Sequence, residues 1–120
     1  HGLFVPVIKD IASLNDEEIR DKIEHLKQLA NTKSIPQEDL KDATIVLSNF
    51  GSFAAKYGTP IIVPPTVVIV GIGRVYSSAI VVEEEIQIGK LLPISISADH
   101  RLITGGEITR FLRTLKDSLA

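Results

Sequence analysis

The chain has 120 residues, of which 44% are hydrophobic and 23% charged, and its formal net charge is −2. This composition is typical of one globular domain or part of one, and the absence of a basic block argues against nucleic-acid binding driven by phosphate neutralisation. The sequence contains no cysteine, which excludes disulfides, thiolate nucleophiles and Cys-ligated zinc.

The sequence also lacks a segment with the features of a membrane span. Its longest apolar run covers residues 61–73, is interrupted by Pro64 and Pro65, and is too short to cross a bilayer. No segment has the layout of a signal peptide. Because the chain contains no methionine, we expect it to be a processed product or a piece of a longer protein.

The first predicted elements are a strand and a helix. Residues 2–8 are apolar and β-branched, which predicts a strand, with Pro6 at an edge or irregular position. Asn15 has the character of an N-cap and Glu18 follows it by three residues, close to a capping box. Apolar residues then recur at helical spacing: Ile19, Ile23, Leu26 and Leu29. His25 lies in this helix without a partner at metal-ligand spacing, and we expect no special role for it.

Residues 31–42 are polar and predict a loop, with one turn over residues 37–40. A second strand is predicted over residues 43–48, in which alternation places Ser48 at the strand end on a partly polar face. The simplest structural role for this hydroxyl is a hydrogen bond to backbone. Residues 49–60 form a loop rich in small residues, and a loop of this length inside a compact domain is more often functional than not.

The second half of the chain is rich in strand patterns. Residues 67–73 are strongly β-branched, and residues 74–82 continue the strand or begin the next one. Residues 83–85 form an acidic tip that predicts a hairpin turn, and residues 91–98 alternate between apolar and serine positions. After Gly105 and Gly106 an amphipathic helix follows, with core positions at Ile108, Phe111, Leu112, Leu115 and Leu119.

The predicted fold class follows from these elements. Several strands and two packing helices favour an α/β two-layer sandwich with the helices on one face of a mixed, mostly antiparallel sheet. The hairpin-like run over residues 67–98 is the source of the antiparallel pairing.

The most informative stretch covers residues 98–106, where His100 lies between Asp99 and Arg101. A histidine at a strand end, just before a glycine-marked turn, is held rigidly and still reaches a cleft, as a general base must. The alternative is a structural histidine in a loop braced by an ion pair. The local sequence leaves both interpretations open.

Four motifs in order give the chain a family resemblance: residues 2–8 (GLFVPVI), Ser48-Asn49-Phe50-Gly51, residues 60–65 leading to Gly71-Ile72-Gly73, and Asp99-His100-Arg101 with Gly105 five after the histidine. In this order the chain resembles the catalytic domain of the dihydrolipoamide acyltransferases. These are the E2 components of 2-oxo-acid dehydrogenase complexes, and they share the chloramphenicol acetyltransferase fold. The resemblance implies that residues 1–120 are the C-terminal half of that domain.

The resemblance also implies a site. His100 matches the histidine of the D-H-R-x-x-D-G signature and would be a general base that takes the proton from a thiol of coenzyme A or dihydrolipoamide. Ser48 matches the hydroxyl residue that stabilises the oxyanion. Asp99 and Arg101 would brace the histidine loop, and no metal is needed. The second aspartate of the signature is Thr104 here, which we expect to keep the geometry and to leave activity reduced or otherwise compensated.

The resemblance further implies partners. In the family the site lies between subunits of a homotrimer, and trimers build a large core that works with lipoyl domains and with the E1 and E3 components. Lipoamide and coenzyme A would then be substrates, with acetyl as the expected acyl group and a branched-chain acyl group next. A bacterial cytoplasm and a mitochondrial matrix both fit.

Two alternatives stay open from the sequence. The chain is a scaffold fragment with weak or no activity, because of Thr104 or because only half of the domain is present. Or it is an acetyltransferase for a soluble small molecule, as the chloramphenicol enzymes are, although residues 2–8 and 48–51 favour the complex-bound family.

Overall fold

A computed structural model describes residues 3–53 and 55–119. The chain divides between Ala43 and Thr44 into two compact units, and each is described by itself.

The first unit contains one long helix and two short 3-10 turns. Helix α1 covers Asp16–Asn31, with η1 at Ile11–Ser13 before it and η2 at Gln37–Leu40 after it. The predicted N-cap is confirmed, because the Asn15 side chain accepts a hydrogen bond of 2.8 Å from the Glu18 backbone N–H. The single turn predicted over residues 37–40 is confirmed as η2.

The strand predicted over residues 2–8 is wrong for the described part, residues 3–8, and Gly2 lies outside the described residues. The segment has no strand assignment, although the Val7 N–H donates to the Asp39 carbonyl at 2.7 Å. A strand needs a ladder of backbone partners along its length, and Pro6 has no N–H to contribute. The apolar pattern alone therefore overstated the local structure.

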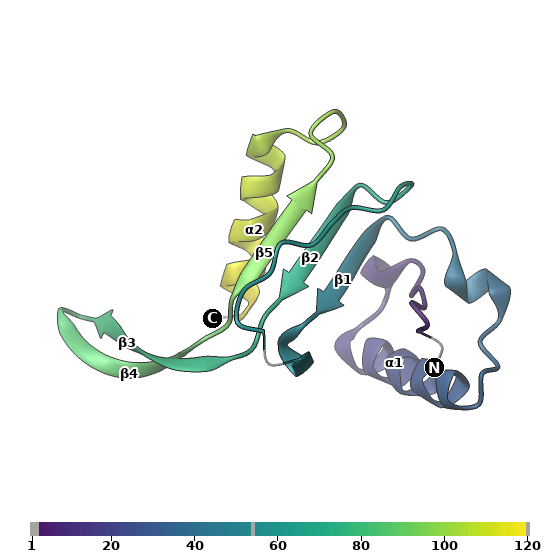
Figure 1. Cartoon of the computed structure of the whole chain (residues 1–120), viewed down its shortest axis with the longest axis horizontal. Coiled ribbons are helices and arrows are strands. Elements are labelled where there is room, and N and C mark those ends of the chain that lie inside the picture. The colour runs from purple at the N-terminus through teal and green to yellow at the C-terminus, as the bar shows by residue number, and fades with distance from the viewer. Residues whose placement is uncertain (1–2, 54, 120) are drawn as a thin grey trace. The chain divides into compact units, whose positions relative to one another are not determined.

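The second unit is built on a three-stranded sheet in the order β1-β2-β5 (Figure 1). Strand β1 covers Ile45–Asn49, β2 covers Val68–Ile72 and β5 covers Ile94–Ala98. Strands β1 and β2 are parallel, whereas β2 and β5 are antiparallel. The sheet is therefore mixed, as expected.

The two faces of this sheet carry different side chains. One face bears apolar residues, of which Val68 and Val70 are 7% and 5% exposed. The other face bears Ser95 and Ser97, whose hydroxyls donate to the carbonyls of Gly58 and Pro60 at 2.8 and 2.7 Å. The loop between β1 and β2 therefore lies across the serine face, and the alternation predicted for residues 94–98 is confirmed.

Helix α2 covers Gly105–Leu119 and packs against β5, on the face opposite to this loop (Figure 1). Its half-buried residues are Ile108, Leu112 and Leu115, whereas Phe111 and Leu119 are exposed. The α/β class and the terminal amphipathic helix are confirmed. Among the described residues, no helix is both long and apolar enough to cross a bilayer.

A two-stranded hairpin extends from this unit, with β3 at Tyr76–Val82 and β4 at Glu85–Leu91 (Figure 1). Its two tip residues, Glu83 and Glu84, have φ values of 49° and 66°, the left-handed geometry that matches a two-residue hairpin turn. The acidic tip is therefore confirmed as a hairpin turn. At the base of the hairpin, the Lys56 ammonium lies 3.6 Å from the centroid of the Tyr76 ring.

The strand predicted over residues 91–98 is wrong as a single element. Strand β4 ends at Leu91 and β5 begins at Ile94, so the chain changes sheets across Leu92 and Pro93. Pro93 has no N–H for a ladder, but its carbonyl accepts from Gly73 at 2.9 Å.

Candidate active site

His100 lies in the turn that follows β5. The Asp99 N–H donates to the Val67 carbonyl at 2.9 Å and so extends the β2–β5 pairing by one residue. The Asp99 carbonyl then accepts from Leu102 and Ile103, both at 3.0 Å, which closes the turn around the histidine. His100 itself is exposed. A rigid backbone thus presents a solvent-accessible imidazole.

An ion pair bridges this turn from one side of His100 to the other. The Asp99 carboxylate accepts from Arg101 Nε at 2.9 Å, from Nη2 at 2.7 Å and from the Arg101 backbone N–H at 3.1 Å. These hydrogen bonds hold the pKa of Asp99 at about 2, below its usual value. The Asp99 side chain is 21% exposed, whereas that of Arg101 is 86% exposed. The pair fixes the backbone on both flanks of the histidine.

Thr104 is the N-cap of α2 and forms a capping box with Glu107. The Glu107 carboxylate accepts from the Thr104 N–H at 2.7 Å and from the Thr104 hydroxyl at 2.9 Å. The Glu107 N–H donates back to Thr104 Oγ1 at 3.3 Å. The pKa of Glu107 is lowered, first by the Thr104 backbone N–H and then by its hydroxyl. The T-x-x-E spacing of this capping box is visible in the sequence.

The His100 ring lies against the start of α2. A Cβ atom placed on Gly105 would lie 3.9 Å from His100 Nε2, an ordinary contact distance. A Cβ at position 105 would therefore contact the imidazole without displacing it. The cap at Thr104 begins the first turn of α2, and the His100 ring lies beside it.

Ser48 lies at the other end of the same sheet. It is half-buried in β1, beside Gly71 of β2, which in turn lies beside Ser95 of β5. Whereas Ser95 donates to the loop, the Ser48 hydroxyl has no hydrogen-bond partner among the residues that the structure describes. The expected bond from Ser48 to backbone is therefore not seen there.

Glycines allow the loop after β1 to pack closely over this end of the sheet. A Cβ atom on Gly71 would lie 2.7 Å from the Phe50 ring, and one on Gly58 would lie 2.8 Å from the same ring. The Phe50 ring therefore lies between two glycines. A small cavity of about 50 Å³, lined by Phe50, Tyr57, Gly58, Pro93, Ile94 and Ser95, lies beside it.

The register shows that one chain does not bring Ser48 and His100 together. Ser48 pairs with Gly71, whereas the last residue of β5, Ala98, pairs with Val68 and through it with Ile45. The two rows are separated by three residues, or about 10 Å of strand, and His100 lies beyond the farther row. Ser48 and His100 therefore lie at opposite ends of the sheet.

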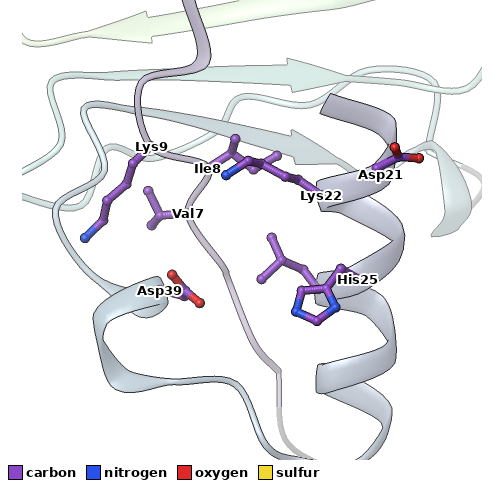
Figure 2. A pocket seen from close by; sticks show the side chains of 8 residues that line it. Val7, Ile8, Lys9, Asp21, Lys22, His25 and Asp39 are labelled. Carbon is purple, nitrogen blue, oxygen red and sulfur yellow. The ribbon is translucent and has the colours of Figure 1, made fainter. Parts of the chain in front are cut away.

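The first unit contains a larger cavity, of about 480 Å³, which the sequence did not indicate. Figure 2 shows Lys22 and His25 extending from α1 toward the extended segment that carries Val7 and Ile8. Asp39 lies on the side of the cavity opposite His25 (Figure 2). The cavity is lined by two lysines, two aspartates and apolar side chains, which together indicate no specific chemistry. It gives no reason to assign a special role to His25.

Comparison with known proteins places the chain in a family. The family model for the catalytic domain of the 2-oxoacid dehydrogenase acyltransferases matches residues 1–120. The chain therefore belongs to this acyltransferase family.

Two relatives illustrate its range. The acetyltransferase component of the pyruvate dehydrogenase complex of Mycoplasma capricolum is 37% identical over 120 residues, which cover 100% of this chain and 27% of that protein. The succinyltransferase component of the mouse 2-oxoglutarate dehydrogenase complex is 34% identical over 115 residues, covering 96% of this chain and 25% of that protein. The chain thus spans about a quarter of the length of these relatives.

Solved structures agree with the fold. The Azotobacter vinelandii dihydrolipoamide acetyltransferase, studied for the role of a serine, a histidine and an asparagine in its catalytic mechanism, has a TM-score of 0.89 and 29% identity. The match covers 99% of this chain and 49% of that chain. The cubic core of a pyruvate dehydrogenase multienzyme complex gives a TM-score of 0.89, 29% identity, and coverage of 99% and 49%.

Proposed function

We propose that the chain is the C-terminal half of an E2 catalytic domain that transfers an acyl group between dihydrolipoamide and coenzyme A. The observation that carries this proposal is a match of intervals. The serine, histidine and asparagine under study in the A. vinelandii acetyltransferase are spaced as Ser48, His100 and Thr104 are in this chain. Coverage of about half of the solved catalytic chains supports the assignment of residues 1–120 to one half of the domain.

In the proposed reaction, His100 takes the proton from the thiol of coenzyme A or dihydrolipoamide. The thiolate attacks the carbonyl carbon of the other partner's thioester, a new C–S bond forms, and the negative charge moves to the carbonyl oxygen. The Ser48 hydroxyl donates a hydrogen bond to that oxyanion. When the tetrahedral intermediate collapses, the old C–S bond breaks and the imidazolium returns its proton to the departing thiolate.

The separation of Ser48 and His100 extends this proposal to assembly. Because the two residues lie at opposite ends of one sheet, a site that uses both takes them from two neighbouring copies. We propose a homotrimer with three such shared sites, which builds a larger core. The similarity to a chain from a cubic core supports this assembly. Lipoyl domains and the E1 and E3 components would be its partners.

The acyl group and the compartment belong to the same proposal. An acetyltransferase component is among the relatives with the most identical residues, so acetyl is the proposed group. The mouse succinyltransferase is nearly as similar, so sequence identity favours acetyl only by a small margin. Relatives are bacterial and mitochondrial, and the proposed location is accordingly a bacterial cytoplasm or a mitochondrial matrix.

The test measures transfer of acetyl from acetyl-coenzyme A to dihydrolipoamide, monitored as formation of the acetyl-dihydrolipoamide thioester. The oligomeric mass is measured by light scattering. His100→Ala is expected to lower kcat by about 10²- to 10⁴-fold, because the general base is lost. His25→Ala changes the other described histidine and is expected to leave kcat unchanged. If the parent chain assembles but transfers no acyl group, the proposed enzyme is wrong and the scaffold interpretation replaces it.

A further inference from the structure

The capping box at the start of α2 fixes the direction in which the Thr104 hydroxyl donates. Glu107 Oε2 lies 2.9 Å from Thr104 Oγ1, and the same oxygen accepts the Thr104 backbone N–H. An ionised carboxylate only accepts, so the single proton of the Thr104 hydroxyl points to Glu107. Thr104 Oγ1 therefore offers only lone pairs to any other group, as a carboxylate or amide oxygen would.

The charge of Glu107 is part of this arrangement. Donation from the Thr104 N–H and hydroxyl lowers the pKa of Glu107, so the carboxylate is ionised at neutral pH. Thr104 alone has an oxygen but no charge. In the Thr104–Glu107 pair, the acceptor oxygen Thr104 Oγ1 is hydrogen-bonded to a carboxylate that carries a full negative charge.

The His100 ring lies beside the first turn of α2. Its Nε2 atom is 3.9 Å from the position of a Cβ on Gly105, and Gly105 follows Thr104 directly. In the A. vinelandii acetyltransferase, an asparagine under study for its catalytic role lies four residues after the histidine, as Thr104 lies four residues after His100. Asparagine caps a helix and offers a side-chain acceptor without help from a second residue.

We propose that Glu107 is a positioning residue for His100, which acts through Thr104 and supplies with it the anchored acceptor that asparagine supplies alone. The inference rests on the proposed acyl transfer and names a residue that the resemblance does not. Glu107 orients the Thr104 hydroxyl as an acceptor and fixes the first turn of α2 beside the imidazole. The ring then keeps one orientation and one tautomer.

The kinetic test uses three variants of the assembled chain. Glu107→Gln keeps a side chain that is suited to a capping box but removes the charge that orients the threonine proton. We expect kcat to fall roughly 10- to 100-fold with KM within about twofold, as for other losses of alignment. The Thr104→Asn variant should make Glu107 dispensable, so that adding Glu107→Gln to it changes kcat by less than about twofold.

Glu18→Gln is the matched control. Glu18 holds the same position after the N-cap of α1, where its N–H bonds to Asn15. Glu18→Gln should leave kcat unchanged and should lower the melting temperature less than Glu107→Gln does, because the Glu107 carboxylate accepts two hydrogen bonds from Thr104. If Glu107→Gln leaves kcat unchanged, or if its kcat effect persists in the Thr104→Asn background, Glu107 is only a helix cap and the inference is overturned.

A second readout does not depend on catalysis. Nitrogen NMR of the imidazoles reports the tautomer and hydrogen bonding of each ring, and His25 serves as an internal reference. Glu107→Gln should change the His100 signals and leave those of His25 in place. If the chain transfers no acyl group but the His100 signals respond, the proposed function fails and the coupling stands. If they do not respond, the coupling fails whatever the activity.

Discussion

The two ends of the three-stranded sheet are built by different physical means. At the Ser48 end, close packing holds the loop: backbone packs on backbone at Gly51 and Gly73, and Gly71 leaves space for the Phe50 ring. At the His100 end, side-chain hydrogen bonds and charges hold the turn, through Asp99 with Arg101 and Thr104 with Glu107.

The difference fits the roles proposed for the two residues. An oxyanion donor needs a small hydroxyl in a fixed position, which close packing provides. A general base needs a ring that stays accessible while its backbone is held, which a braced turn provides. Substitutions that exchange these properties should therefore affect the two ends in different ways.

Among the variants that contrast the two ends, the largest effect is expected from removal of the Ser48 hydroxyl at the packed end. Ser48→Ala should lower kcat for acetyl transfer by about 10²- to 10³-fold, because one oxyanion donor is lost. KM and the melting temperature should change little, because the Ser48 hydroxyl has no hydrogen-bond partner among the described residues. Ser97→Ala is the contrasting variant: it removes a hydroxyl bonded to the Pro60 carbonyl and should lower stability rather than kcat.

The next effect tests close packing itself. A Cβ on Gly73 would collide with the Lys56 carbonyl oxygen and lie 3.3 Å from the Pro93 side chain. Gly73→Ala should therefore lower the free energy of unfolding by more than about 2 kcal/mol, because backbone must move. Gly106→Ala, whose new atom would lie 3.6 Å from Arg110, is the control and should not lower the free energy of unfolding. Equal unfolding energies for the two variants, measured in urea, would contradict the packing described for this end.

The braced end predicts a dependence on pH. The pKa of Asp99 is about 2 in the folded chain, below its usual value of 3.8. The stability that this carboxylate contributes is therefore present above about pH 4 and is lost as the pH falls toward 2. Asp99→Asn should lower the melting temperature at pH 6, and the gap from the parent should close at pH 2. A gap that is independent of pH would show that the charge does not brace the turn.

The smallest effect concerns the space beside the imidazole. Gly105→Ala adds a methyl group 3.9 Å from His100 Nε2, at a helical position without positive φ. The helix should gain up to about 1 kcal/mol from the better propensity of alanine, while kcat falls slightly because the ring has less room. Gly106→Ala should give the gain in stability without the loss of kcat. Identical kinetics for the two variants would place the ring away from Gly105.

Local patterns predicted much of this architecture. Asn15 predicted the start of α1, the spacing from Ile108 to Leu115 predicted α2, and the acidic tip predicted the hairpin, because each of these signals lies within a few residues. The strand over residues 2–8 failed because strand formation depends on a distant partner. The break at Pro93 was missed because the apolar alternation continues across it.

The candidate site was only half visible in the sequence. His100 and Ser48 stand out by type and order, but their separation depends on β1 running parallel to β2 and β5 running antiparallel to it. Strand direction is a property of the whole fold, which no local motif contains. The capping box of Thr104 and Glu107, in contrast, was readable from spacing.

Co-assembly of two inactive variants tests most directly whether neighbouring chains share each site. His100→Ala and Ser48→Ala chains, unfolded together and reassembled in equal amounts, should recover about a quarter of the parental acyl-transfer activity. Each shared site draws its histidine and its serine from different chains, so about one site in four receives both. If the mixture stays as inactive as the separate variants while its mass shows mixed assembly, the two residues do not act across chains and the account is contradicted.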